Sequence, residues 1–376
     1  MRIVEDARGV TVGLALTEVR RAPLRFGLLT GAVALLVFLV LLLSTLSSAL
    51  IRSFTGALEG LDADVLVYSA AARDNIQASR LAPEVVTAVG AVDGVADAAA
   101  IATLTTSSPL PDGTEDLQVF GFEPGAPGQP TGLSSGRLPE APGEAAVDGG
   151  GVALGDTVEV RPGGVELTVV GLLRGAQFSA IPTAYVDLGT YDEIVRSANP
   201  GAPFVPVNAV AVTVADGQDP AAVAAAVSDA VDGVTGYTLD DAVGKIPGVE
   251  SVSQTFGILV GLTFVIGIVV IGFFFLILTV QKLKVFTLLR AVGASTGRLS
   301  ATVSLQITIV VLLASVVAVA LTLLAVQGLN TGIPVSLQPG LVIGTVLGVL
   351  VFSLLAGLLS VRRIARIDPF SAAGAR

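Results

Sequence analysis

The sequence reads Phe26-Gly-Leu-Leu-Thr-Gly-Ala-Val-Ala-Leu-Leu-Val-Phe-Leu-Val-Leu-Leu-Leu-Ser-Thr-Leu-Ser-Ser-Ala-Leu-Ile51 between Arg25 and Arg52, which makes 26 residues without a charge. A helix needs about 20 such residues to cross the hydrocarbon core of a bilayer. The run is longer than the apolar part of a signal peptide, and no convincing small-residue cleavage site follows it. These residues therefore predict a transmembrane helix over residues 26–51.

Two more uncharged runs occur, over residues 251–281 and 299–361. The second of them holds 63 residues, too many for one crossing, and its turn-forming residues 327–340 divide it in two. We therefore predict four transmembrane helices, over residues 26–51, 255–280, 301–326 and 339–361. The alternative, buried core helices of a soluble protein, fits poorly with apolar helices of this length that recur along the chain.

The composition agrees with a membrane protein and excludes several kinds of chemistry. Hydrophobic residues make up 52% of the chain and charged residues 14%, whereas a soluble domain carries about 25% charged residues. Histidine and cysteine are absent, and the single methionine is Met1. Structural zinc, disulfides, Ser-His triads and His-ligated haem are excluded. We expect no metal or cofactor in this chain.

Basic residues predict the orientation, because cytoplasmic loops of membrane proteins carry an excess of Lys and Arg. They are frequent in residues 1–25, 281–300 and 362–376. With four crossings all three segments fall on one side, the cytoplasm of a bacterial cell that holds this chain in its inner or plasma membrane. Residues 52–250 then form an extracytoplasmic domain, and residues 327–338 a short external loop.

The external domain contains two segments that each predict a β-α-β unit. In each, the helix begins near a proline and is followed by the pentapeptide Ala-Val-Asp-Gly-Val, at residues 91–95 and 230–234. The predicted elements are strand 64–68, helix 83–89 and strand 98–105, and then strand 207–214, helix 220–231 and strand 234–238. A repeated unit of this kind predicts a ferredoxin-like subdomain. Chance similarity is the alternative in a chain so rich in Ala and Val.

Residues 111–204 between these units differ, because Gly and Pro are frequent and the predicted strands are short, over residues 156–160, 165–173 and 183–187. They predict a β-rich insertion, so that the fold class is an α-helical membrane protein with an α+β external domain. Residues 53–250 contain 27 acidic and 7 basic residues. The acids read as solvated surface charge rather than a calcium site, because the spacing of an EF-hand is missing.

The cytoplasmic segment Val280-Gln-Lys-Leu-Lys-Val-Phe-Thr-Leu-Leu-Arg-Ala-Val-Gly-Ala-Ser295 carries the most specific pattern. A helix here places apolar residues, Leu289 among them, on one face and Thr287 and Arg290 on another. Two interpretations stay open on physical grounds alone. The segment is either an interfacial helix that anchors the preceding span or a coupling helix that docks into a groove on a cytoplasmic partner.

This segment resembles the cytoplasmic signature of MacB/FtsX-like permeases of ATP-binding-cassette (ABC) systems, in the small DevC-like or haem-exporter-like form. The match lies in Phe286-Thr-Leu-Leu-Arg-Ala-Val-Gly-Ala-Ser295. Residues 15–25 resemble the amphipathic N-terminal helix of that family, and residues 363–370 its basic tail. The resemblance implies that an ATPase contacts the loop residues Lys284, Phe286, Leu288, Leu289, Arg290, Ala291, Val292, Gly293 and Ala294.

The resemblance also implies partners and a mechanism. The chain has no GxxxxGK[ST] motif, so ATP and Mg²⁺ would be bound by a separate cytoplasmic ATPase in two copies, beside a second copy of the permease. Its expected role is ATP-driven export or extraction of an amphiphilic or envelope substrate, with no chemistry of its own. Two alternatives are an FtsX-like mechanotransmission module that activates a cell-wall hydrolase and a membrane-anchored sensor. An envelope partner is possible at the external domain, and no nucleic acid is expected.

Overall fold

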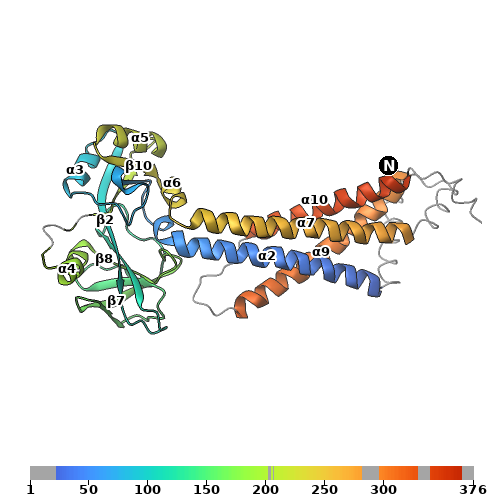
Figure 1. Ribbon diagram of the computed structural model, residues 1–376, viewed down its shortest axis with the longest axis horizontal. Helices are drawn as coiled ribbons and strands as arrows, with labels where there is room; N and C mark the ends of the chain where they lie inside the picture. Colours follow the sequence, from blue (N-terminus) through green and yellow to red (C-terminus); the bar gives the residue numbers. More distant parts are fainter. Residues whose placement is uncertain (1–22, 202–204, 206, 282–295, 329–338, 366–376) are drawn as a thin grey trace, which may run out of the picture. The chain divides into compact units, whose positions relative to one another are not determined.

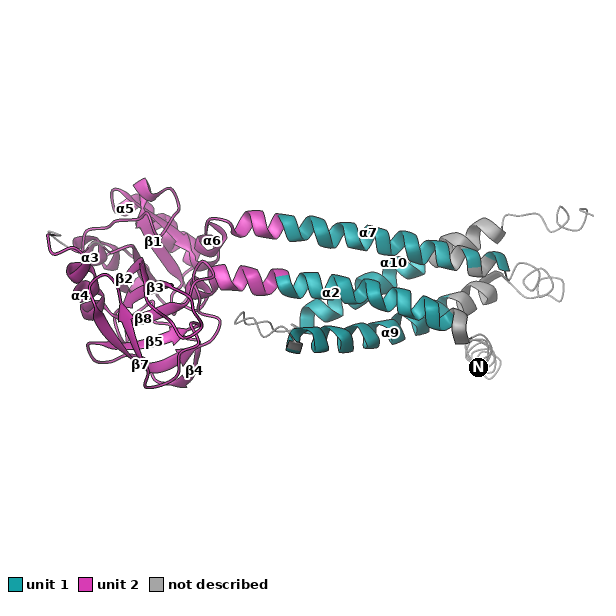
Figure 2. Ribbon diagram, turned by 60° about the horizontal axis from the view of Figure 1, so that its bottom comes forward, with its two compact units in different colours: residues 1–46, 255–330, 335–376 teal, residues 47–254, 331–334 magenta. Residues whose placement is uncertain are grey.

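The computed structural model of the protein describes residues 23–201, 205, 207–281, 296–328 and 339–365 (Figure 1). Contacts divide the chain into two compact units (Figure 2). The first unit takes residues 1–46, 255–330 and 335–376, and the second takes residues 47–254 and 331–334. The second unit thus extends a few residues beyond each end of the predicted external domain, 52–250.

The first unit is built from long apolar helices: α2 (Pro23–Glu59), α7 (Val249–Gln281), α9 (Thr296–Gly328) and α10 (Pro339–Ala365). Residues spaced three or four apart bury one face of α9, among them Ile307, Val311, Ala314 and Ala318, in a cluster that also contains residues of α2, α7 and α10. Its other face is also apolar but exposed, as at Val316. A helix that is apolar on all sides is typical of a membrane span.

Three of these helices are long and apolar enough to cross a membrane, over Phe26–Glu59, Val249–Phe274 and Ser304–Gln327. Within the described residues the apolar part of α10 is shorter, Pro339–Leu355. The predicted fourth span at 339–361 therefore stays a prediction. Helix α2 runs eight residues beyond the predicted end at Ile51, and α7 begins six residues before residue 255, because both helices continue into the second unit.

The second unit contains one ten-stranded sheet, in the order β10-β1-β9-β2-β3-β8-β5-β7-β4, with β6 paired to β7. The strands are β1 (Val65–Ser69), β2 (Val95–Ser107), β3 (Asp116–Phe122), β4 (Leu133–Gly136), β5 (Glu144–Asp148), β6 (Thr157–Val160), β7 (Val165–Leu173), β8 (Thr183–Asp187), β9 (Ala209–Val214) and β10 (Val234–Thr238). Strand β2 pairs with β9 up to Ile101 and with β3 from Ala102 onward. The predicted insertion therefore continues the same sheet.

The two predicted β-α-β segments form β1, α3 (Glu84–Gly90) and β2, and β9, α5 (Pro220–Ala230) and β10. Alternation along β1 decides which residue faces which core: Val65 and Val67 pack with α3 and α5, whereas Leu66 and Tyr68 face the opposite core. Both Ala-Val-Asp-Gly-Val pentapeptides form a turn with the glycine in the left-handed region, at φ 91° for Gly94 and 77° for Gly233.

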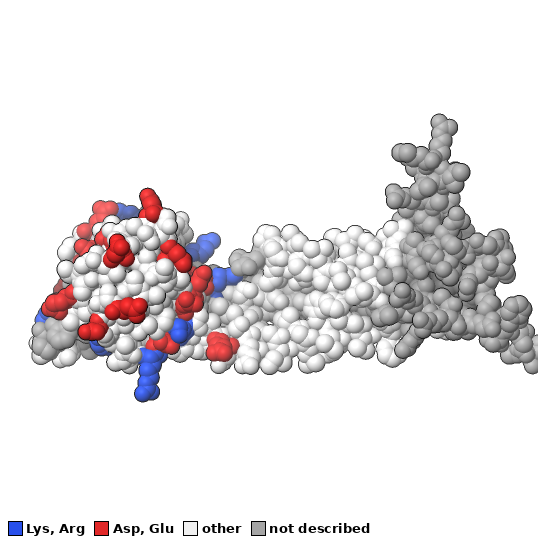
Figure 3. Space-filling model, turned by 90° about the horizontal axis from the view of Figure 1, so that it is seen from above, with Lys and Arg blue, Asp and Glu red and all other residues white. Residues whose placement is uncertain are grey.

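In the second half of the sheet, the predicted strands at 156–160, 165–173 and 183–187 are present as β6, β7 and β8. Strands β3, β4 and β5 and helix α4 (Leu188–Ala198) were not predicted. The carboxylate of Asp187 caps α4 by accepting hydrogen bonds from the backbone N–H of Gly189 (2.8 Å) and Thr190 (3.2 Å). Acidic side chains are scattered over the visible face of this unit (Figure 3).

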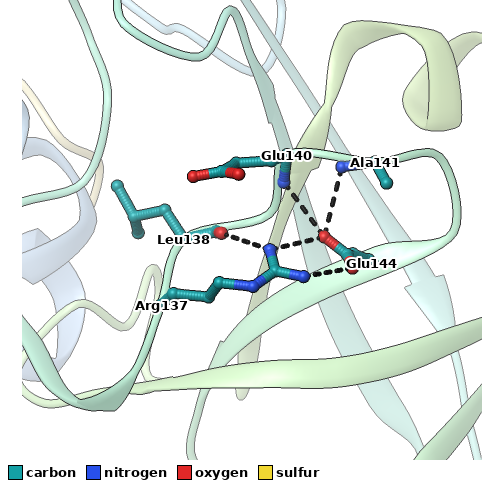
Figure 4. A network of polar contacts seen from close by, with 5 residues as sticks. All are labelled: Arg137, Leu138, Glu140, Ala141 and Glu144. Carbon is teal, nitrogen blue, oxygen red and sulfur yellow. Dashed lines mark hydrogen bonds and ion pairs between the residues drawn. The ribbon is translucent and has the colours of Figure 1, made fainter.

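The turn between β4 and β5 is closed by a polar network around Glu144 (Figure 4). The two Nη atoms of Arg137 donate to its two carboxylate oxygens, at 2.7 and 2.5 Å. One oxygen also accepts the backbone N–H of Glu140 and of Ala141, both at 3.1 Å. Arg137 and these N–H groups lower the pKa of Glu144 to about 2. All of these interactions favour the ionised carboxylate.

We expect this network to make the free energy of unfolding depend on pH in the acidic range. A folded-state pKa near 2, against an ordinary value of 4.5, gives stability that is fully present above about pH 4.5 and is lost as the pH falls toward 2. For Glu144→Gln, the thermal unfolding midpoint should decrease less between pH 6 and pH 3 than it does for the wild type. Glu166→Gln, at an exposed glutamate of β7, is the control and should leave the fall unchanged. Equal curves for wild type and Glu144→Gln would contradict the prediction.

Candidate functional site

The residues predicted to contact an ATPase, from Lys284 to Ala294, lie outside the described residues, as do most of the predicted N-terminal helix and the end of the tail. That site therefore stays a prediction. The described residues instead bring together three segments at the end of α2. We call this group the α2 junction, and it consists of residues 53–62, 128–132 and 174–180.

The loop between β7 and β8 inserts into the hydrogen-bond ladder of α2. In an α-helix the N–H of Ala57 donates to the carbonyl of Ser53. Here the Ala57 N–H donates to the Gln177 carbonyl (2.9 Å), and the Ser53 carbonyl accepts the Ala180 N–H (2.7 Å). A third bond joins the Ser179 N–H to the Phe54 carbonyl (3.2 Å). The loop thus bonds to helix backbone groups that normally bond to each other.

Two backbone features show how closely the loop fits the helix. Ser179 and Ala180 adopt left-handed conformations, with φ 54° and 58°, which cost a non-glycine residue about 1 kcal/mol or more each. Opposite them, a Cβ atom at Gly56 would lie 2.2 Å from the carbonyl oxygen of Gly175. Only glycine at position 56 leaves room for the loop.

The chain that leaves α2 is held a second time, by residues 128–131. The carbonyl of Gly60 accepts hydrogen bonds from the N–H (2.8 Å) and the hydroxyl (2.9 Å) of Thr131. Asp62 exchanges backbone hydrogen bonds with this segment, donating to Gln129 (3.0 Å) and accepting from Gly128 (2.8 Å). The end of α2 is therefore fixed to two separate segments of the second half of the sheet.

Buried groups tie the inserted loop to the sheet beneath it. The carboxylate of Asp148, on β5, accepts the Ala176 N–H (2.6 Å), and the Tyr185 hydroxyl, on β8, donates to the Ala176 carbonyl (2.7 Å). Phe178 is 1% exposed and packs edge-on against Phe120, with 5.5 Å between ring centres. Burial raises the pKa of Asp148 above its ordinary value. The loop that contacts the end of α2 is therefore bonded to both β5 and β8.

The start of α7 packs into the same core as the end of α2. Leu58 and Leu61 of the α2 end, Ile246, and the partly buried Val249 belong to one cluster. The short helix α6 (Leu239–Gly244) leads into α7, and Lys245 beside it forms an ion pair with Asp74 at 2.9 Å. Both long helices therefore end on the core that underlies the α2 junction.

The α2 junction is an attachment made of backbone and side-chain contacts. Its contacts are backbone hydrogen bonds and buried apolar side chains, with Asp148 as a buried carboxylate that is engaged by a backbone N–H. Across the part of the chain that the structure describes, no group of three or more His, Cys, Asp or Glu could hold a metal ion.

Comparison with known families assigns the chain. The description "MacB-like periplasmic core domain" matches residues 26–230, and "FtsX-like permease C-terminal" matches residues 257–369. The chain belongs to the MacB/FtsX-like family of ABC transporter permeases. The first match covers α2 from residue 26 and the second unit up to the end of α5, and the second covers α9, α10 and α7 from residue 257. The permease is thus the membrane subunit of an ABC transporter.

Curated relatives agree with this family. An uncharacterised ABC transporter permease of Mycobacterium tuberculosis (strain H37Rv) is 26% identical to the permease over 321 residues, covering 84% of this chain and 86% of the relative. The putative hemin transport system permease protein HrtB of Staphylococcus epidermidis is 24% identical over 246 residues, covering 64% and 66%.

Two solved structures match the second unit of the permease. The periplasmic region of MacB from Actinobacillus actinomycetemcomitans is 10% identical, with a TM-score of 0.35, and covers 51% of this chain and 96% of that one. The extracellular domain of the noncanonic ABC-type transporter YknZ from Gram-positive bacteria is 14% identical, with a TM-score of 0.32, and covers 46% and 99%.

Proposed function

We propose that this permease couples ATP hydrolysis by a separate cytoplasmic ATPase to movement of its extracytoplasmic domain, for export or extraction of an amphiphilic or envelope substrate. The observation that carries the proposal is the α2 junction. There an apolar helix of membrane-spanning length is bonded through its own ladder to a loop that is fixed to β5 and β8. A helix attached in this way passes its displacement to the sheet.

The proposed arrangement follows the sequence and the family. Four spans with both termini in the cytoplasm place residues 53–250 outside and the 281–300 loop beside the ATPase. A separate ATPase is needed because this chain carries no Walker A motif. Two ATPase copies and two permease copies complete the assembly that the family resemblance implies. The antiparallel strand order β10-β1-β9-β2, with α3 and α5 packed in one core, supports the ferredoxin-like interpretation of this part of the sheet.

A second candidate function is mechanotransmission, in which the same movement activates a cell-wall hydrolase and nothing is transported. It is favoured by the absence of Asp, Glu, Lys and Arg from the four predicted spans, since a charged pathway is not available there. Transport and signalling differ in one measurable respect. A transported amphiphile changes the ATPase rate of the reconstituted complex, whereas a hydrolase binds the extracytoplasmic domain.

Purification of the full chain from membranes of its own cells tests the proposal. We expect an ABC ATPase to co-purify, and its ATP hydrolysis in lipid nanodiscs to change by about twofold or more when the permease is present; this threshold is an order-of-magnitude expectation for coupled binding. A full chain that is correctly inserted but binds no ABC ATPase would refute both the transport and the mechanotransmission proposals.

A further inference from the structure

A cleft of about 880 Å³ lies in the second unit, away from the α2 junction. The segment Gln77–Arg80 and strand β2 form one side, and the end of β6 with helix α4 forms the other. Its volume falls within the range of about 300–1,000 Å³ that is usual for small-molecule sites. Neither the family match nor the proposed coupling assigns a role to this cleft.

The charge of the cleft is opposite to that of the domain around it. Residues 53–250 contain 27 acidic and 7 basic side chains. Two of those bases, Arg80 and Arg161, line the cleft, and none of its described lining residues is Asp or Glu. Anions are therefore repelled by most of this domain and attracted at the cleft.

Arg80 is positioned without being neutralised. Its Nη1 atom donates to the carbonyl oxygens of Gln77 and Ser79, both at 2.7 Å. Backbone carbonyls thus hold one end of the guanidinium, and no carboxylate among the described residues lies within ion-pair distance of it. A guanidinium offers five donors in a planar fork, which matches carboxylate and phosphate oxygens.

Arg161 is a second cation that can exchange partners. Its Nη2 atom lies 3.1 Å from the carboxylate of Glu159, and both side chains are about half exposed. Exposed ion pairs of this kind contribute little free energy. The backbone of Arg161 is fixed to β2, because its N–H donates to Ser107 (2.8 Å) and its carbonyl accepts the Thr106 hydroxyl. A bound anion can therefore replace Glu159 without movement of the backbone.

The rest of the lining supplies an apolar wall and a fixed floor. Leu104, Val160 and Ile194 are among the apolar residues of the wall. On the floor, the Asn208 amide accepts the Thr103 N–H (2.7 Å) and donates to the Ser79 carbonyl (3.1 Å). This amide is occupied by the protein's own backbone, so charge recognition falls to the two arginines.

We propose that this cleft binds an amphiphile with a carboxylate or phosphate head, which Arg80 holds, and an apolar body, which lies along the wall. Arg161 makes a second, weaker contact with the head. The inference narrows the substrate class of the proposed exporter to anionic amphiphiles. Only the transport of the bound ligand rests on the proposed function. Binding itself requires neither ATP nor the ATPase.

The test uses a tryptophan reporter, because the chain contains no tryptophan. Ala198→Trp places one at the exposed part of the cleft lining on α4, and Ala222→Trp places one on the exposed face of α5 as the control. The full chain in phosphatidylcholine nanodiscs, without nucleotide, is titrated with octanoate, octyl phosphate, octyltrimethylammonium and octyl glucoside. Octanoate and octyl phosphate separate the two head groups.

We expect a saturable change in Ala198→Trp emission with at least one of the two anions and none with the cation or the uncharged glucoside. Adding Arg80→Gln should weaken binding about tenfold, the effect of losing one hydrogen bond to a charged group. Arg161→Gln should weaken it less, and Arg196→Gln, outside the cleft lining, should leave it unchanged.

The proposal is overturned if the cation or the glucoside gives the same titration, if Arg80→Gln leaves the affinity unchanged, or if Ala222→Trp reports the same curve, which would indicate partition into lipid. The absence of a saturable response to both octyl anions overturns it as well. None of these outcomes depends on whether an ABC ATPase co-purifies.

Discussion

Leu289→Asp is expected to abolish the coupling of ATP hydrolysis to this permease. If the predicted coupling helix docks its apolar face into a groove on the ATPase, the substitution buries a carboxylate there without a partner. Such burial costs several kcal/mol, so binding of the ATPase should weaken about a hundredfold or more. The measurement is ATPase co-purification, together with the ATP hydrolysis rate of the complex in nanodiscs.

Thr287→Asp is the matched control, because it adds the same charge to the opposite face of the predicted helix. It should retain most of the binding. The two variants also separate the interpretations that stay open for this segment. If the segment is only an interfacial helix, neither substitution alters a contact with the ATPase. The amount of ATPase that co-purifies would then be the same for the two variants.

Gly56→Ala is expected to disrupt the α2 junction, although alanine normally stabilises a helix by about 1 kcal/mol relative to glycine. The added Cβ atom would lie 2.2 Å from the Gly175 carbonyl oxygen, well inside contact distance. Either the loop leaves the helix, with loss of its three backbone hydrogen bonds, or the helix bends away. We expect a loss of about 3 kcal/mol of stability, at the upper end of overpacking costs.

Gly31→Ala, in the same helix, is the control, since nothing lies within 4 Å of its added Cβ atom. It should be neutral or stabilising in thermal unfolding. Ala180→Pro disrupts the same contact from the loop side, because it removes the N–H that donates to Ser53 and because its ring, with φ of about −65°, excludes the left-handed backbone of Ala180. Because both changes break one contact, the double variant with Gly56→Ala should cost less than the sum of the two. Strict additivity would show that the inserted loop does not act as a unit.

The sequence predicted the elements whose pattern is local. Charge-free runs located the long helices, and alternating valines with a proline at or just before the helix start located both β-α-β segments. Strand β5 was not predicted because its Ala-rich sequence has a low strand propensity. It pairs in parallel with β7, which does not follow it directly in the chain. Helix α4 was predictable: Asp187 is a good N-cap, and Tyr191 and Ile194 repeat at helical spacing.

The α2 junction left almost no signal in the sequence. Left-handed backbone is typical of Gly and Asn, yet Ser179 and Ala180 adopt it because contacts with α2 hold them there. The bonds between α2 and the inserted loop are made by backbone atoms of residues more than a hundred positions apart, and those to residues 128–131 join residues 66 to 71 positions apart. Gly56 was the one visible hint, as a glycine inside a helix that continues to Glu59.

Strand β2 limits how the extracytoplasmic domain can be shortened. Its 13 residues serve two halves of the sheet, with β9 beside the first part and β3 beside the second. Deleting residues 111–204, as one would to obtain a minimal β-α-β domain, would leave Ala102–Ser107 as an unpaired edge. Open edges of this kind recruit strands from other molecules and aggregate. A shortened domain without the insertion is therefore a poor choice for crystallography, and loss of the insertion in evolution is disfavoured for the same reason. Changes in the length of its surface loops are tolerated.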